Sequence, residues 1–303
     1  MNTELQPADR DLSALVQVVL DTLPSEHSKR SYGRHLRDYL QWTRTSTTPP
    51  GRRSVQEYAA KLTAGGKRPS TVNLALSAIK KLYSEAAENG WVDDAIAASV
   101  DRIPGQRRLG TSVGNWLDAA DMHAMLALPD LGTVGGRRDS AVLHLLYAGG
   151  LRREEVVTLT VCQVDHRDGR LCLVDLIGKG GRVRTVPLPK WAEEPLLWWR
   201  DYRLLVDACA PDDRYITALR GEDMHDRSVY RVVAQYRKLA GIEAKVGPHD
   251  LRRTSAKHQL KGGAKLEQIS VVLGHASLQT TQRYLGVDLD LEHPACDCLP
   301  VPK

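Results

Sequence analysis

The stretch from His249 to Tyr284 concentrates side chains that can bind anions and move protons. It begins His-Asp-Leu-Arg-Arg-Thr, holds three histidines and ends in a tyrosine. Between Asp250 and Tyr284 its single acid is Glu267. Guanidinium forks bind phosphate oxygens, imidazole accepts protons near neutral pH, and a phenol becomes a nucleophile when a neighbour helps to remove its proton. These groups suit attack on a phosphodiester, an anion that nearby carboxylates would repel.

Two upstream segments carry further basic side chains. Residues 150–156 read Gly-Leu-Arg-Arg-Glu-Glu-Val and follow a helical pattern that a glycine pair interrupts. Residues 178–181, Gly-Lys-Gly-Gly, lie between two runs rich in β-branched residues. This pattern predicts a hairpin turn that presents Lys179.

Taken together, these segments resemble the phage integrase (tyrosine recombinase) family. Residues 150–156 resemble its first conserved box, and 178–189 (GKGGRVRTVPLP) resemble its lysine-bearing hairpin. Residues 249–254 resemble its second box, and Leu-Gly-His at 273–275 followed by Tyr284 resembles its end. Each motif alone is a weak signal, but all occur in the family's order over roughly 135 residues. The resemblance covers most of the chain, and the chain is similar to the Xer-like or transposon-borne two-domain members.

The resemblance implies a site-specific recombinase that cleaves and rejoins DNA strands through a 3′-phosphotyrosine intermediate. The expected catalytic set is Arg152, Lys179, His249, Arg252, His275 and Tyr284, with Glu155 in support. The sequence has no GxxxxGK[ST] motif and no carboxylate cluster like that of a two-metal nuclease, so neither a cofactor nor a metal is expected.

Each role follows from a chemical need of strand cleavage. The guanidiniums of Arg152 and Arg252 would stabilise the charge of the pentacovalent phosphate. Tyr284 would attack, with His249 as general base, and Lys179 would protonate the leaving 5′ oxygen.

The remaining members of the set have supporting roles. His275 would hydrogen-bond the phosphate, and Glu155 would orient the site from one helical turn beyond Arg152.

Structural alternatives remain for these residues. Lys179 can be an ordinary turn residue, and Tyr284 can be a packing anchor. His144 and His258 match no motif and are expected to be structural or surface residues. Two rival functions also remain: a type IB topoisomerase or hairpin resolvase, and a DNA-binding regulator that no longer cuts. The complete residue set argues against the regulator.

Positive charge is concentrated in one region of a chain whose net charge is only +5. Residues 28–110 hold 15 Lys and Arg against 7 Asp and Glu, as a polyanion-binding face requires. A merely solvated basic surface is the alternative. The expected DNA contacts are Lys29, Arg30, Arg34, Lys67, Arg68, Lys80, Lys81, Arg182 and Arg184.

The patterns predict a mainly α protein with a small β-sheet. Residues 1–101 are expected to form a helical core-type DNA-binding domain, 102–115 a linker, 116–290 a mixed α+β catalytic domain, and 291–303 a tail. In the first domain, Ser54 is expected to cap a helix with Glu57 three residues on. In the second, strands are expected over 161–164, 171–177 and 182–187.

The expected partners are double-stranded DNA with inverted half-sites and further copies of the chain in a synaptic tetramer, with exchange of the tail between protomers left open. No apolar run approaches the roughly 20 residues that span a bilayer, so no membrane partner is expected. Five scattered cysteines and the lack of a secretion signal suit a cytoplasmic protein.

Overall fold

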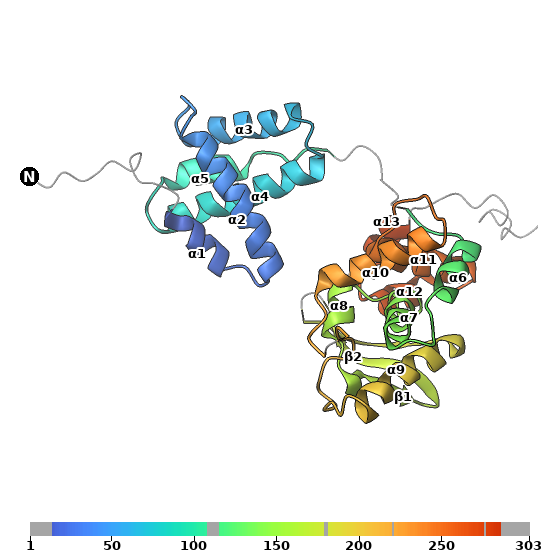
Figure 1. Ribbon diagram of the computed structural model, residues 1–303. Coiled ribbons are helices and arrows are strands. Elements are labelled where there is room, and N and C mark those ends of the chain that lie inside the picture. Colours follow the sequence, from blue (N-terminus) through green and yellow to red (C-terminus); the bar gives the residue numbers. More distant parts are fainter. Residues whose placement is uncertain (1–13, 108–114, 179–180, 220, 276, 286–303) are drawn as a thin grey trace, which may run out of the picture. The chain divides into compact units, whose positions relative to one another are not determined.

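A computed structural model describes residues 14–107, 115–178, 181–219, 221–275 and 277–285. The chain divides into two compact units, residues 1–110 and 111–303 (Figure 1). The described residues are mostly helical with one three-stranded antiparallel sheet, which confirms the predicted fold class. No helix within these ranges is both long enough and apolar enough to cross a bilayer.

The first unit is a bundle arranged around one long helix. Its helices are α1 (Leu15–Asp21), α2 (Glu26–Thr43), α3 (Arg52–Ala64), α4 (Pro69–Glu88) and α5 (Asp94–Asp101). The central helix α4 contacts the other four. It begins at Pro69, whose fixed φ and missing N–H suit the first turn of a helix. Its apolar residues recur every three or four positions and are buried, among them Val72, Leu76, Ile79 and Tyr83.

The start of α3 differs from the predicted cap. The helix begins at Arg52, so Ser54 is its third residue and not the N-cap. The Ser54 hydroxyl accepts a hydrogen bond from the amide of Gly51 at 3.0 Å. It therefore still bonds an amide that lacks a partner within the helix, but it does so from inside the helix. Glu57 instead accepts a hydrogen bond from the Thr48 hydroxyl at 2.7 Å.

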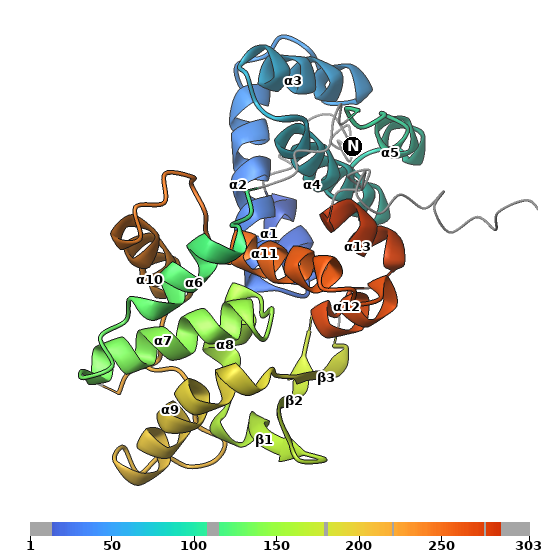
Figure 2. The same ribbon diagram turned by 90° about the vertical axis from the view of Figure 1, so that its right-hand side faces the viewer.

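The second unit surrounds a buried helix. Its helices are α6 (Ala119–Ala127), α7 (Val134–Tyr147), α8 (Arg153–Thr158), α9 (Glu193–Leu205), α10 (Asp226–Leu239), α11 (Pro248–Lys261), α12 (Leu266–Leu273) and α13 (Leu278–Leu285). Helix α7 contacts α6, α8, α9, α10 and α11, and residues 139–146 are all buried. Helices α11, α12 and α13 contact one another, and α12 also contacts β3 (Figure 2).

The sheet has the strand order β1–β2–β3, with β1 (Val164–Arg167), β2 (Arg170–Ile177) and β3 (Val183–Pro187). Leu173 pairs with Val186 and Leu176 pairs with Arg184, so one strand carries an irregularity between these pairs. Asp175 lies there with a φ of 52°, as in a β-bulge. Along β3, Arg184 and Val186 are both buried because alternate residues share a face. The strand predicted over 161–164 is instead a 3₁₀ turn over 161–163, with β1 beginning at its end.

A candidate active site around a buried carboxylate

Helix α11 supplies two of the candidate residues, His249 and Arg252, and also Arg253. Asp250 accepts a hydrogen bond from the amide of Gly247 at 3.0 Å and so fixes the start of the helix. His249, Arg252 and Arg253 follow on its first turns. Positions three apart on a helix share a face, so His249 and Arg252 project to the same side.

Arg252 is anchored inside the protein. Its side chain is 1% exposed. Its Nη1 donates to the carbonyl oxygen of Gly150 at 2.6 Å, and its Nη2 donates to that of Leu273. Its Nε is buried with no hydrogen-bond partner in the described part of the chain. Burial lowers the pKa of Arg252 to about 10, and the charge of Arg152 acts in the same direction. The guanidinium is still charged at neutral pH.

Glu155 lies at the centre of a cluster of three arginines. Its Oε1 accepts a hydrogen bond from Arg152 Nη1 at 2.8 Å, and its Oε2 accepts one from the Arg152 amide at 2.8 Å. Arg184 donates to both oxygens, at 3.0 and 2.8 Å. Arg252 Nη1 lies 3.7 Å from Oε2. Burial alone would raise the pKa of Glu155, but the bonds from Arg184 and the Arg152 amide lower it to about 2. The carboxylate is therefore ionised near neutral pH.

The position of Arg184 differs from the prediction that it contacts DNA. Its side chain is 6% exposed, and its donors face Glu155 and the carbonyl oxygen of Val272. The alternation along β3 turns Arg184 inward with Val186, whereas Arg182, also expected to contact DNA, is exposed. Three of the five N–H donors of Arg184 are therefore bonded to groups inside the protein.

Tyr284 packs among the other candidate side chains. Its hydroxyl donates to the carbonyl oxygen of His249 at 3.0 Å. Its ring centroid lies 5.3 Å from the ring of His249 and 5.3 Å from that of His275, both edge-to-face. The guanidinium of Arg253 lies over the ring at 4.9 Å. Burial raises the pKa of Tyr284, while the charges of Arg252 and Arg253 oppose that change.

Both histidines are held in the neutral form. Burial lowers the pKa of His275 to about 4, assisted by Arg252 and Arg152. Burial of part of the ring also lowers the pKa of His249, again assisted by Arg252. His275 Nδ1 lies 2.8 Å from the hydroxyl of Thr281, a fully buried residue of α13. This bond fixes the orientation of the ring.

Lys179 lies outside the described residues, but the turn that carries it begins beside the arginines. A Cβ added at Gly178 would lie 3.2 Å from Arg184 Nη1 and 3.8 Å from Arg152 Nη1. The Gly178 amide donates to the carbonyl oxygen of Arg182 at 2.7 Å. Residues 178 and 182 are therefore adjacent at the base of the turn.

Some of the basic residues of the first unit that were expected to contact DNA form ion pairs or hydrogen bonds within that unit. Lys29 pairs with Glu26 at 3.0 Å, and Lys81 pairs with Glu85 at 2.7 Å. Lys80 Nζ donates to the carbonyl oxygen of Asp101. The exposed members are Arg30, Arg34, Lys67 and Arg68.

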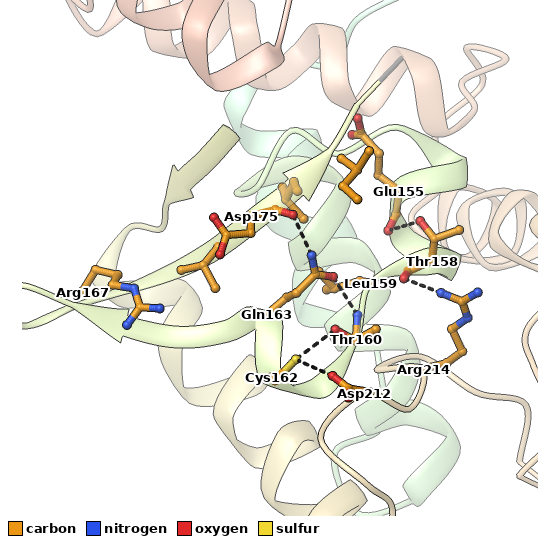
Figure 3. A pocket seen from close by; sticks show the side chains of 13 residues that line it. Glu155, Thr158, Leu159, Thr160, Cys162, Gln163, Arg167, Asp175, Asp212 and Arg214 are labelled. Carbon is orange, nitrogen blue, oxygen red and sulfur yellow. Dashed lines mark hydrogen bonds between the residues drawn. The ribbon is translucent and has the colours of Figure 1, made fainter. Parts of the chain in front are cut away.

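A cavity of about 530 Å³ lies between α8, β2 and the loop around Asp212 (Figure 3). Glu155 reaches its lining, but none of the other candidate catalytic residues does. Arg167 and Arg214 share its wall with Asp175 and Asp212, so its charges are mixed. It does not coincide with the site around Tyr284. Nowhere in the described ranges do three or more His, Cys, Asp or Glu side chains group in a way that could hold a metal.

Comparisons with known proteins identify the family. Residues 115–289 match the model of the "Phage integrase family", and residues 18–90 match the "Phage integrase, N-terminal SAM-like domain". The chain belongs to the phage integrase family. It is similar to tyrosine recombinase XerD of Pseudomonas putida, with 32% identity over 270 residues and 87% of each chain covered. It is also similar to tyrosine recombinase XerC of Thermodesulfovibrio yellowstonii, with 30% identity over 89% of this chain and 91% of that one.

Solved structures of phage integrase family members share the fold. One is XerH site-specific recombinase bound to palindromic difH substrate in a post-cleavage complex, with a TM-score of 0.73 and 19% identity over 90% of this chain and 79% of that one. Another is a lambda integrase (75–356) dimer bound to a COC′ core site, with a TM-score of 0.66 and 16% identity over 92% of this chain and 96% of that one. The activity of this family member is site-specific recombination by tyrosine-mediated strand cleavage and rejoining, which confirms the predicted function.

Two residues at the site of this integrase, Thr281 and Arg253, were not singled out from the sequence, and Arg184 was assigned a different partner. Thr281 contacts His275, Arg253 covers Tyr284, and Arg184 binds Glu155. The alternation of residues 182–187 places Arg184 on the same face as Val186, but it does not show which face is buried. Thr281 and Arg253 have no sequence signal of their own, since each acts through a contact between separate helices.

Proposed function

We propose that this recombinase breaks a DNA strand by attack of the Tyr284 hydroxyl on a phosphodiester held by Arg152 and Arg252. The observation that carries the proposal is the packing of the Tyr284 ring against two neutral imidazoles and beneath a guanidinium. The arginine cluster around Glu155 supplies positive charge for the pentacovalent phosphate.

His249 is the proposed general base. Its depressed pKa keeps it neutral at pH 7, and its ring is in contact with the ring of Tyr284. The main-chain carbonyl that accepts the phenol hydrogen bond cannot itself take the proton, so a side chain must do so.

His275 and Lys179 are proposed to act on the phosphate and the leaving group. When the Thr281 hydroxyl donates to His275 Nδ1, Nε2 carries the ring hydrogen and can donate to a phosphate oxygen. Lys179, on a turn that begins beside Arg152, would protonate the 5′ oxygen as it leaves.

The proposed substrate is double-stranded DNA with inverted half-sites, bound by a synaptic tetramer of this chain. The XerH structure is of a complex with palindromic difH substrate and the lambda integrase structure is of a dimer bound to a COC′ core site, and this supports DNA as the partner. The exposed Arg30, Arg34, Lys67, Arg68 and Arg182 are proposed to contact phosphates. Such contacts add salt-sensitive affinity that does not depend on base sequence.

A covalent trapping experiment tests the proposal. Labelled duplexes taken from the DNA that flanks the gene are nicked near each candidate site, so that a released fragment diffuses away and the adduct accumulates. Wild-type protein should give a denaturation-resistant protein–DNA adduct, and Tyr284→Phe should bind the same DNA and give none. DNA binding by both proteins with an adduct from neither would contradict the proposal. Exchange of strands between two marked sites then separates a recombinase from a topoisomerase.

A further inference from the structure

We propose that Arg184 is a positioning residue. By bonding both carboxylate oxygens of Glu155, it prevents this carboxylate from drawing the guanidinium of Arg252 away from the scissile phosphate. The inference rests on the proposed roles of Arg152 and Arg252. It assigns to Arg184 a place in the reaction although the side chain does not touch the substrate.

The contacts of Arg184 are all internal. Nη1 and Nη2 form a two-point bond with the carboxylate of Glu155, at 3.0 and 2.8 Å, and Nε donates to the carbonyl oxygen of Val272 at 2.9 Å. The side chain is 6% exposed. This fork geometry needs a guanidinium, because an ammonium is a point charge that cannot bond both oxygens in the same way.

The acceptor sites of Glu155 are filled in this arrangement. A carboxylate offers about four lone-pair positions. Arg184 takes two of them, and Arg152 takes two more through Nη1 and its own amide. Arg252 Nη1 lies 3.7 Å from Oε2, beyond hydrogen-bond distance, and bonds the Gly150 carbonyl instead.

Removal of Arg184 would change this balance. One lone-pair position would open on each oxygen of an ionised, buried carboxylate, and Oε2 lies 3.7 Å from Arg252 Nη1. In a poorly solvated site, Glu155 would then draw Arg252 toward itself and away from a bound phosphate. The same loss would remove one of the three positive charges around the carboxylate.

Arg184 also fixes the turn that leads to His275. Gly274 has a φ of 61°, and a Cβ at that position would lie 2.9 Å from Arg184 Cδ. Together with the bond to the Val272 carbonyl, this contact joins β3 to the end of α12. Arg184 thus holds the end of α12 in place against the arginine cluster.

A double-mutant cycle tests the inference. The single-turnover rate of adduct formation is measured on a nicked duplex that the wild-type protein cleaves, for wild type, Arg184→Met, Glu155→Gln and the double variant. Arg184→Met should slow the rate about 100-fold, the scale expected when a reacting group is displaced by about 1 Å. In the double variant no carboxylate remains to capture Arg252. Its rate should therefore fall within about threefold of that of Glu155→Gln, because the two losses are coupled.

Three controls separate this role from others. Arg184→Lys keeps the charge without the fork and should be slower than wild type by about tenfold. Arg203→Met removes another buried arginine, on α9, that bonds Asp207 at 2.6 Å, and gives the general cost of such a loss. DNA affinity measured without cleavage should be unchanged in Arg184→Met, because its donors face the protein.

The outcomes are distinct. Rate losses that multiply in the double variant, or an affinity loss in Arg184→Met, would overturn the positioning role while leaving the proposed function intact. If Arg203→Met slowed the rate as much as Arg184→Met, the loss would reflect the general cost of removing a buried arginine. That result would also overturn the positioning role of Arg184. Failure of the wild-type protein to form an adduct would overturn the proposed function, and this inference with it.

Discussion

The hydroxyl of Tyr284 donates a hydrogen bond to the main-chain carbonyl oxygen of His249 at 3.0 Å. The bond links α13 to the first turn of α11, the helix that also carries Arg252. The phenol is therefore held beside the imidazole of His249. Burial lowers the pKa of this imidazole from 6.5. The contacts of Tyr284 and His249 determine how the rate of cleavage should respond to pH and to substitution.

The rate of cleavage should depend on the protonation of His249. Because the pKa of His249 lies below 6.5, we expect the single-turnover rate to be level near neutral pH and to fall in acid as the base gains a proton. His249→Gln should lower the rate by about 100-fold, within the range for loss of a general base. A pH–rate profile from pH 5 to 9 checks both. Survival of the same acid limb in the variant would assign it to another group.

Stability should fall in acid partly through His275. The folded state holds the pKa of His275 at about 4, below its ordinary value of 6.5, so the unfolded chain binds this proton first. Above pH 6.5 the imidazole is neutral in both states and does not reduce the free energy of unfolding. As the pH falls from 6.5 toward 4, the unfolded chain binds the proton and the free energy of unfolding decreases. We expect a loss of about 1–2 kcal/mol from this group after allowance for solvent screening. Urea unfolding at pH 7 and pH 4.5 should therefore differ less for His275→Gln than for wild type.

The hydroxyl of Thr281 should matter more than its volume. It lies 2.8 Å from His275 Nδ1 in a fully buried position. Thr281→Val keeps the shape and loses the bond, so we expect roughly a tenfold slower cleavage with DNA binding retained, whereas Thr281→Ser should stay close to wild type. Equal rates for Val and Ser would show that the bond does not orient the imidazole.

Gly274 should not tolerate a side chain. Its φ of 61° disfavours other residues, and an added Cβ would press on Arg184 at 2.9 Å. We expect Gly274→Ala to lower the free energy of unfolding by about 1–3 kcal/mol and to slow cleavage as well. Gly263→Ala is a matched control, since Gly263 has a φ of 85° with no atom within 4 Å of the added Cβ. If cleavage slowed equally in Gly274→Ala and Gly263→Ala, the close approach of Arg184 to Gly274 would have no effect on the rate.

Affinity for DNA should depend on salt through the first unit. Lys67 and Arg68 are exposed just before α4. If each contacts a phosphate, replacement of both by Gln should weaken binding and reduce the slope of log affinity against log salt by about 2. Titrations of Tyr284→Phe protein, with and without the two substitutions, measure this slope without cleavage. An unchanged slope would remove these two residues from the DNA-contacting set.

Most helices and two of the three strands follow from the sequence because each has a local signal. Pro69 marks the start of α4, and alternation marks β3. The start of α3 was misplaced because a serine can stand at either of two positions near a helix start. As the N-cap it accepts from an amide two or three residues on, whereas Ser54, at the third helical position, accepts from the N-cap amide of Gly51. The exchange of a strand for a 3₁₀ turn at 161–163 depends on long-range contacts, among them the bond from the Val161 amide to the Asp213 carbonyl.

The motif residues of the site were predictable, but their partners were only partly so. Arg152 is the residue before α8 and Glu155 is the third residue of that helix, so their contact follows from the geometry of a helix start. The contact between Arg184 and Glu155 joins residues 29 apart through a sheet and a helix. The local pattern places Arg184 and Val186 on one face of β3. Which face is buried, and which carboxylate Arg184 meets, depend on how α8 packs against the sheet.

The alternation of β3 has a consequence for how the protein folds. A slip of one residue between β2 and β3 would turn Arg184 to solvent and bring Thr185 inside, so Glu155 would lose its two-point bond. A buried carboxylate without this partner is costly. A mispaired hairpin is therefore destabilised by the unpaired carboxylate of Glu155 as well as by lost packing. The ion pair of Arg184 with Glu155 thus favours the correct register of β2 and β3 in addition to its place at the site.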